Sequence, residues 1–241
     1  MSRFNAISVR EHHGVDICSG EFNAEASLVL DPVLLATADI YEPLVNNSDK
    51  EFSKDYIAFY IVHPHTMKFE IMDKISQYTG LPYIDIKQYG TSIEDFVSYI
   101  KNATFVISDS FHASCFSTIF HKPFVTIDEF ANDARFRSLA DIAGLHNHFV
   151  PMKTFDYRRL EEYMAVESWD DVEARLNKER ERSLKWLVDN IESPMPEVPK
   201  QVRMAEAFYR DLDLRLNRAE GKLFHFDSLL QRVAELEAKL K

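Results

Sequence analysis

An alternation of strand-like and helix-like segments between residues 56 and 150 is the strongest constraint on the fold of this 241-residue chain. Strands that alternate with helices of about 10 to 15 residues predict helical crossovers between parallel strands. We therefore expect an α/β fold, with a Rossmann-like parallel sheet domain over residues 33–150. The expected strands span 56–62, 83–86, 105–107, 124–127 and 149–150, and the expected helices span 66–79, 92–102, 113–120 and 132–143.

The segments on either side of this domain have other patterns. Residues 1–32 contain two short strand-like runs around a helix at 10–20, closed by a glycine. We interpret them as the remnant of an N-terminal Rossmann-like domain and its crossover, most of which the chain would lack. Residues 151–192 are expected to form a helical extension, with helices at 155–166 and 169–191, and the three prolines within residues 193–200 predict a linker.

Beyond the linker, residues 201–241 show a different repeat. Steps of alternately three and four residues from Val202 to Leu240 meet an apolar residue at every position except Glu237. Such a repeat over about five heptads is typical of a long coiled-coil helix, and hence of a homo-oligomer or a partner helix. The alternative is a single amphipathic helix that lies on its own domain.

Composition and sequence patterns argue against several classes of protein. The formal charge of −11 argues against a general nucleic-acid binder. No apolar run approaches the roughly 20 residues of a transmembrane helix, and the first residues lack the order of a signal peptide, so a cytoplasmic protein is expected. Cys18 and Cys115 lie in apolar helical patterns, as buried thiols of a reducing compartment would. The absence of a Gly-rich phosphate loop argues against nucleotide binding through such a loop.

The unit at 104–127 carries the most chemical information, because a polar turn separates its strand from its helix. Such a turn lies at the carboxyl edge of a parallel sheet, where α/β proteins bind ligands, and the helix begins with free backbone N–H groups. Ser110, His112 and Ser114 would add hydroxyl and imidazole groups there. The segment therefore predicts a phosphate or carboxylate site. In the alternative interpretation Asp109 or Ser110 is only a helix N-cap and His112 is a hydrogen-bonded histidine.

Other basic residues are placed to reach the same edge. Arg10 follows a strand-like run and could hold an anion in a bidentate contact, or it could form a surface ion pair with Glu11 or Asp16. His63 follows the strand at 56–62, so it could line the same cleft. Arg135, near the start of the helix at 132–143, is a further candidate for anion binding.

Metal and covalent chemistry find less support. Histidines occur in pairs at 12–13, 63–65 and 146–148, but no cluster of cysteines or carboxylates completes a zinc site, so no metal is expected. The chain has no nucleophile elbow, and Cys115 lies inside an expected helix. Covalent nucleophilic catalysis is therefore not indicated.

Four ordered motifs resemble the polysaccharide pyruvyl transferase family. They are FNAISVREHHGVDIC at 4–18, SLVLDPVLL at 27–35, EDFVSYIKNATFVISDSFHASCFSTIFHKPFVTI at 94–127 and RFRSLADIAGL at 135–145. The resemblance implies half of a GT-B-like fold. It also implies transfer of the enolpyruvyl group of phosphoenolpyruvate, the donor substrate, to a sugar of a cell-surface polysaccharide, which forms a pyruvate ketal. No further cofactor is implied.

The resemblance also suggests roles for individual residues. His112, in the Asp-x-Phe-His turn, matches the histidine associated with catalysis, and Arg10 matches an arginine expected at the cleft. Ser110, Phe111 and Ser114 of the same segment are expected to bind substrate, and Ser110 stands where many members have arginine.

Two other functions remain open. The chain could be a non-catalytic module, displayed on a coiled coil, with a vestigial site. It could also be half of a GT-B-like glycosyltransferase that binds a sugar nucleotide. Stabilisation by phosphoenolpyruvate, by a nucleotide sugar or by neither would distinguish the three.

Overall fold

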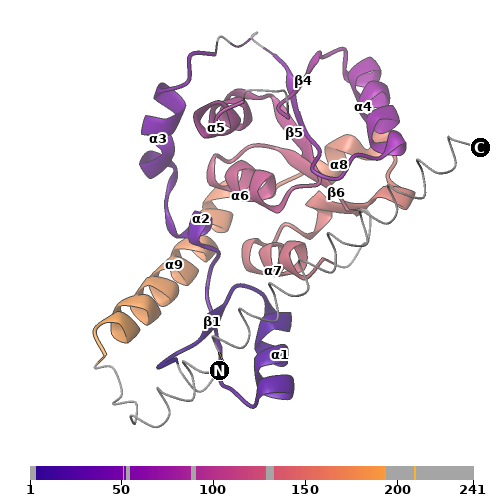
Figure 1. Ribbon diagram of the computed structural model, residues 1–241. Coiled ribbons are helices and arrows are strands. Elements are labelled where there is room, and N and C mark those ends of the chain that lie inside the picture. The colour runs from indigo at the N-terminus through magenta and orange to yellow at the C-terminus, as the bar shows by residue number, and fades with distance from the viewer. Residues whose placement is uncertain are drawn as a thin grey trace, which may run out of the picture. The chain divides into compact units, whose positions relative to one another are not determined.

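The computed structural model describes residues 4–50, 52, 55–87, 91–128, 133–193 and 209 (Figure 1). The chain divides into two compact units, Met1–Ser193 and Pro194–Lys241. The predicted coiled coil at 201–241 lies outside the described residues except for Tyr209, as does the predicted linker except for Ser193.

A five-stranded parallel sheet forms the centre of the first unit, as predicted. The strand order is β4-β3-β5-β6-β7, so the chain moves outward from β3 to β4 and then returns across β3 to form β5. This reversal makes a topological switch point between β3 and β5, where doubly wound sheets bind ligands. The strands are β3 (Ile57–Tyr60), β4 (Tyr83–Asp85), β5 (Phe105–Ser108), β6 (Phe124–Asp128) and β7 (Phe149–Pro151).

Helices cover both faces of this sheet (Figure 1). Right-handed crossovers send the chain to opposite faces on the two sides of the switch point. Accordingly, α4 (Thr66–Thr79) packs on one face, together with the short α8 (Leu160–Met164). The other face carries α5 (Ile93–Asn102), α6 (Phe111–Ile119) and α7 (Ala134–Ala143).

Two hydrophobic cores result, one on each face of the sheet. Successive residues of a strand point to opposite faces, so neighbours in sequence belong to different cores. In β3, Ala58 packs with the α5–α7 core, whereas Ile57 and Phe59 pack with α4. In β5, Val106 and Ile107 are divided in the same way. Burial on both faces explains why these strands are apolar throughout.

Local signals define several helix ends. Ser92 accepts a hydrogen bond from the backbone N–H of Asp95, whose carboxylate accepts one from the backbone N–H of Ser92, and these two bonds form a capping box at the start of α5. Gly80 ends α4 at φ 71° and Gly144 ends α7 at φ 75°, in the left-handed region that glycine adopts without strain.

The N-terminal segment belongs to the same compact unit as the sheet. It contains a separate two-stranded parallel sheet of β1 (Ser8–Val9) and β2 (Ser27–Leu28), joined by α1 (His12–Phe22). This helix passes the predicted stop at Gly20 and ends at Asn23, which adopts φ 47°. Two further helices, α2 (Pro32–Leu35) and α3 (Ala38–Asn46), lead to the main sheet.

The predicted helix at 155–166 is found only in part, over residues 157–164. This stretch contains the 3-10 helix η3 (Tyr157–Arg159) and then α8, while another 3-10 helix, η2 (Met152–Thr154), precedes it. The Asp156 carboxylate accepts the backbone N–H of Arg158 at 3.1 Å as the N-cap of η3, so the helical stretch begins at Tyr157. The predicted helix at 169–191 is confirmed as α9 (Trp169–Ile191). Among the described helices, none has both the length and the apolar character needed to span a bilayer.

Candidate anion-binding site

The turn between β5 and α6 is built by side chains that bond to backbone. Ser108 donates to the carbonyl oxygen of Tyr60 at 2.5 Å and accepts the backbone N–H of Ser110 at 2.9 Å. Ser110 is the N-cap of α6, since its hydroxyl oxygen accepts the backbone N–H of Ala113 at 3.4 Å. Phe111 and His112 therefore occupy the first turn, where N–H groups have no partner within the helix.

An internal ion pair fixes this turn against the neighbouring strand. The Asp109 carboxylate accepts the backbone N–H groups of Val62 and His63, at 2.6 and 3.0 Å. It also accepts the ammonium group of Lys68 at 2.7 Å. His63 thus lies at the predicted edge, with Nδ1 3.7 Å from Asp109, but its side chain is 69% exposed. The switch point is consequently bridged by a buried carboxylate.

Two arginines from distant segments meet on the ring of Phe111. The guanidinium carbon of Arg10 lies 5.4 Å from the ring centroid, and that of Arg135 lies 5.9 Å from it. Both distances fall within the range of cation–π contacts. The structure therefore brings together three predicted site residues that are far apart in the sequence, at the first turn of α6.

Asp31 joins this cluster to His112. Its Oδ2 accepts a hydrogen bond from Nη1 of Arg10 at 2.5 Å, and its Oδ1 lies 3.9 Å from Nε2 of His112. The hydrogen bond to Asp31 raises the pKa of Arg10. Arg10 also donates to Glu11 at 2.9 Å, so one of the two predicted ion-pair partners is found, whereas Asp31 takes the place of the other, Asp16.

Arg135 is held by Asp133, the N-cap of α7. Nε and Nη2 of Arg135 donate to the two carboxylate oxygens, at 3.0 and 2.6 Å. This bidentate contact raises the pKa of Arg135 and lowers that of Asp133. Within the described part of the chain, no hydrogen bond occupies Nη1 of Arg135 or Nη2 of Arg10. Each arginine thus keeps a donor for a ligand.

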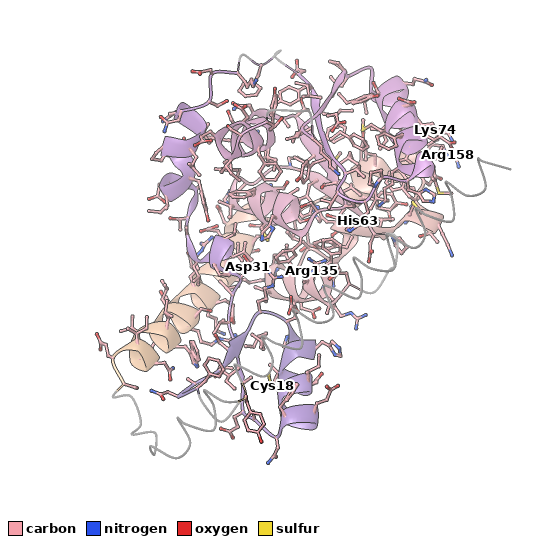
Figure 2. The ribbon with its side chains drawn as sticks, viewed as in Figure 1. Cys18, Asp31, His63, Lys74, Arg135 and Arg158 are labelled. Carbon is pink, nitrogen blue, oxygen red and sulfur yellow. The ribbon has the colours of Figure 1, made fainter. Side chains whose placement is uncertain are left out.

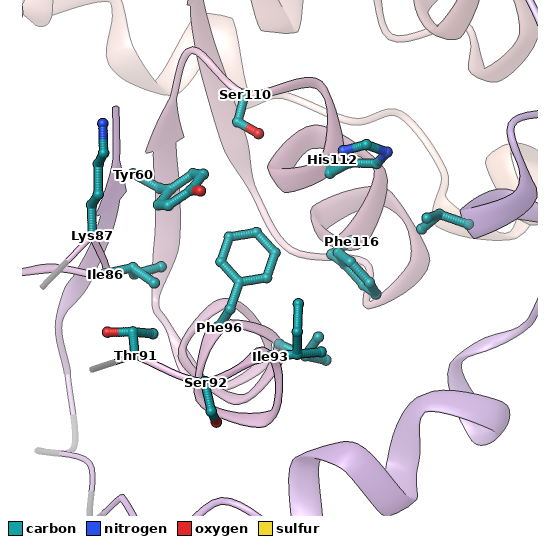
Figure 3. A pocket seen from close by; sticks show the side chains of 12 residues that line it. Tyr60, Ile86, Lys87, Thr91, Ser92, Ile93, Phe96, Ser110, His112 and Phe116 are labelled. Atoms are coloured by element: carbon teal, nitrogen blue, oxygen red, sulfur yellow. The ribbon is translucent and has the colours of Figure 1, made fainter. Parts of the chain in front are cut away.

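A cavity of about 540 Å³ opens on the other side of the first turn of α6 (Figure 3). Ser110 and His112 line it, so these two predicted residues share a pocket, but Arg10, Phe111, Arg135 and His63 do not line it. The side chain of His112 is half exposed. The other lining residues are Val33, Tyr60, Ile86, Lys87, Thr91, Ser92, Ile93, Phe96, Val97 and Phe116.

Ser114 does not reach either side of the site. It is buried one turn into α6, where its hydroxyl donates to the carbonyl oxygen of Ser110 at 3.1 Å and bonds the Thr126 hydroxyl at 2.7 Å. The bond to Thr126 anchors α6 to β6, whereas the bond to Ser110 stays within the first turn of α6. The structure therefore gives Ser114 a packing role.

Comparison with known families shows to which family the chain is related. A family model described as polysaccharide pyruvyl transferase matches residues 1–129. The chain belongs to the polysaccharide pyruvyl transferase family. Searches of curated proteins and of solved structures found no match.

The part that matches the polysaccharide pyruvyl transferase family includes Arg10, Asp31, Asp109 and His112, whereas Arg135 lies beyond it. The sequence analysis missed two of these, Asp31 and the ion pair of Asp109. Both left a signal. Asp31 precedes Pro32, an N-cap pattern, and Lys68 interrupts the apolar face formed by Ile71, Met72 and Ile75.

The described part of this pyruvyl transferase family member contains no cluster of side chains suited to a metal ion. Nowhere in it do three or more His, Cys, Asp or Glu side chains lie close enough together to hold one ion. Cys18 and Cys115 are both buried and free, and burial raises the pKa of the Cys115 thiol well above its ordinary value.

Proposed function

We propose that the protein transfers the enolpyruvyl group of phosphoenolpyruvate to a sugar of a cell-surface polysaccharide and forms a pyruvate ketal. The observation that carries the proposal is the convergence of Arg10, Arg135 and His112 on the first turn of α6. Phosphoenolpyruvate carries a carboxylate and a phosphate, and the cluster offers guanidinium, imidazole and free N–H donors for both.

The residues have distinct roles in this mechanism. Arg10 and the N–H groups of the first turn bind the anionic groups, with Arg135 as a further donor. His112 protonates the methylene carbon of the donor or steadies the departing phosphate. Protonation leaves a cation-like carbon, which a sugar hydroxyl attacks while its proton passes to His112. The carbon–oxygen bond to phosphate then breaks, and a second hydroxyl closes the ketal and gives its proton to the departing phosphate.

Asp31 has a positioning role in this mechanism. Because its carboxylate faces both Arg10 and His112, it can orient the two side chains relative to each other. The proposal further includes a GT-B-like arrangement, with a second Rossmann-like half across the site, and a cytoplasmic location. Association of copies or partners through a coiled coil at 201–241 is also part of it.

Ligand-dependent stability tests the proposal without knowledge of the acceptor. Phosphoenolpyruvate should raise the melting temperature of the full chain more than inorganic phosphate does, since binding to the folded state stabilises it. A nucleotide sugar that stabilises the protein instead would favour the glycosyltransferase alternative. No effect of either would favour the non-catalytic module.

The role of His112 needs a turnover assay with isotope-labelled phosphoenolpyruvate and polysaccharide precursors. His112→Ala should lose most phosphate release, whereas His146→Ala, at an exposed histidine outside the cluster, should keep it. Normal turnover of His112→Ala would show that the assigned role is wrong.

A further inference from the structure

The 540 Å³ cavity beside His112 is larger and more apolar than an anionic donor requires. Its volume lies in the range of about 300 to 1,000 Å³ that is typical of pockets for drug-sized ligands. Aromatic rings form much of its wall. Tyr60 packs edge to face with Phe96 at 4.9 Å between centroids, and Phe96 packs in the same way with Phe116 at 5.9 Å.

Two hydroxyl groups lie at the His112 end of this cavity. Figure 3 shows the hydroxyl groups of Tyr60 and Ser110 there, with the His112 ring beside them. Within the described residues, the Tyr60 hydroxyl has no hydrogen-bond partner. The Ser110 oxygen accepts from Ala113 and keeps its own proton to donate. This end can therefore bind the hydroxyls of a sugar.

The remainder of the cavity wall is mostly apolar. Ile86, Ile93, Phe96 and Phe116 offer no hydrogen bonds, and a buried hydroxyl without a partner costs about 1 to 3 kcal/mol. The polar residues Lys87, Thr91 and Ser92 also line it, but Nζ of Lys87 donates to the carbonyl oxygen of Val62 and the Ser92 oxygen accepts the backbone N–H of Asp95. An apolar group, in contrast, gains from burial against these side chains. The lining thus favours a ligand that is polar at one end and apolar at the other.

We infer that this cavity binds the apolar aglycone of an amphipathic acceptor, an aryl or alkyl group whose attached sugar lies beside Ser110 and His112. The inference rests on the proposed function, because it takes His112 as the point where sugar and donor meet. It adds that the acceptor is a glycoconjugate with an apolar carrier and not a free sugar.

Binding of matched glycosides tests the substrate class. The 4-methylumbelliferyl, n-octyl and methyl β-glucosides, and the corresponding β-galactosides, share a sugar and differ in the aglycone. Titration of the full chain, with the octyl compound below its critical micelle concentration, should give at least one apolar glycoside a Kd about tenfold or more below that of its methyl counterpart. The tighter of the two identifies the carrier as aryl or alkyl. Equal affinities for all three would overturn the inference.

Two isoleucines provide a matched pair of variants. Ile93 lines the cavity and is 64% exposed in the first turn of α5, whereas Ile40 is 61% exposed in the first turn of α3 and does not line it. A carboxylate is tolerated at the start of a helix, so both proteins should fold. Ile93→Asp should weaken binding of the apolar glycoside about tenfold or more, and Ile40→Asp should not. An unchanged Kd for Ile93→Asp would overturn the assignment to this cavity.

The same proteins separate this inference from the proposed function. Phosphoenolpyruvate should stabilise Ile93→Asp as it stabilises the unaltered chain, because Ile93 is not one of the residues proposed to bind it, which are Arg10, Arg135 and His112. Loss of apolar glycoside binding with normal stabilisation by phosphoenolpyruvate contradicts only the aglycone site. Selective glycoside binding without any effect of phosphoenolpyruvate upholds the site and contradicts the proposed donor.

Discussion

The ammonium group of Lys68 lies 2.7 Å from the carboxylate of Asp109, and both side chains are almost completely buried. Removal of one partner from a buried ion pair leaves the other charge without compensation. Lys68→Met should therefore lower the free energy of unfolding by about 3 to 5 kcal/mol, measured by urea denaturation.

Lys74→Met is the matched control, because Lys74 lies exposed on the same helix, α4. Its effect should stay within about 0.5 kcal/mol. Equal unfolding free energies for the two variants would show that the pair does not hold the turn before α6.

The capping box of α5 predicts a smaller loss. Ser92→Ala removes the acceptor for the backbone N–H of Asp95 and should cost about 0.5 to 2 kcal/mol in urea denaturation. Ser92→Thr keeps a hydroxyl at the N-cap and should retain most of the stability. Equal free energies of unfolding for Ser92→Ala and Ser92→Thr would show that the cap has no measurable role.

His148 makes the stability depend on pH. Its ring is fully buried, Nδ1 donates to the carbonyl oxygen of Phe124 at 2.8 Å, and burial lowers its pKa from 6.5. Below pH 6.5 the unfolded chain therefore takes up a proton that the folded chain does not. The unfolding free energy should fall by up to about 1.4 kcal/mol per pH unit from pH 6.5 down to the folded-state pKa.

His148→Gln removes this contribution. Denaturation curves at pH 7.5, 6.5 and 5.5 should show a smaller decrease for the variant than for the unaltered chain. Parallel pH profiles would contradict the assignment.

Arg10→Lys keeps the positive charge but changes the geometry of the N–H groups, so it tests how residue 10 binds phosphoenolpyruvate. A lysine ammonium cannot hold Asp31 and Glu11 and also present a planar donor to a ligand, as the guanidinium can. The Kd for phosphoenolpyruvate should rise about tenfold, a loss of about 1.4 kcal/mol. Calorimetric titration measures it, and Arg158→Lys, at an exposed ion pair away from Asp31 and Arg135, should leave it unchanged (Figure 2).

Local signals predicted most of the fold. Apolar runs located the five strands, and the predicted bounds of α4 and α9 match those of the structure to the residue. The predicted helix at 155–166 is shorter in the structure, because the side chain of Asp156 caps a helical stretch that begins at Tyr157 and α8 ends at Met164. Periodicity alone does not locate such ends.

The site was predicted in part because its members follow strands or begin helices. Arg10, Phe111, His112 and Arg135 are each at such a position, and the structure brings them together. Long-range pairing was not predictable. Arg10 and Asp31 are 21 residues apart, and Lys68 and Asp109 are 41 apart, so only the fold determines that they meet.

The division of each strand between two cores limits how the chain can change in length. Deletion of one residue within β5 would exchange the faces of Val106 and Ile107, and with them both the α4 side and the α5–α7 side of the protein. A deletion there would damage two cores at once, whereas a change in the length of a loop leaves the faces of the strands unchanged. Insertions and deletions should therefore be tolerated best between the elements, except in the turn before α6, where the buried carboxylate of Asp109 fixes the chain.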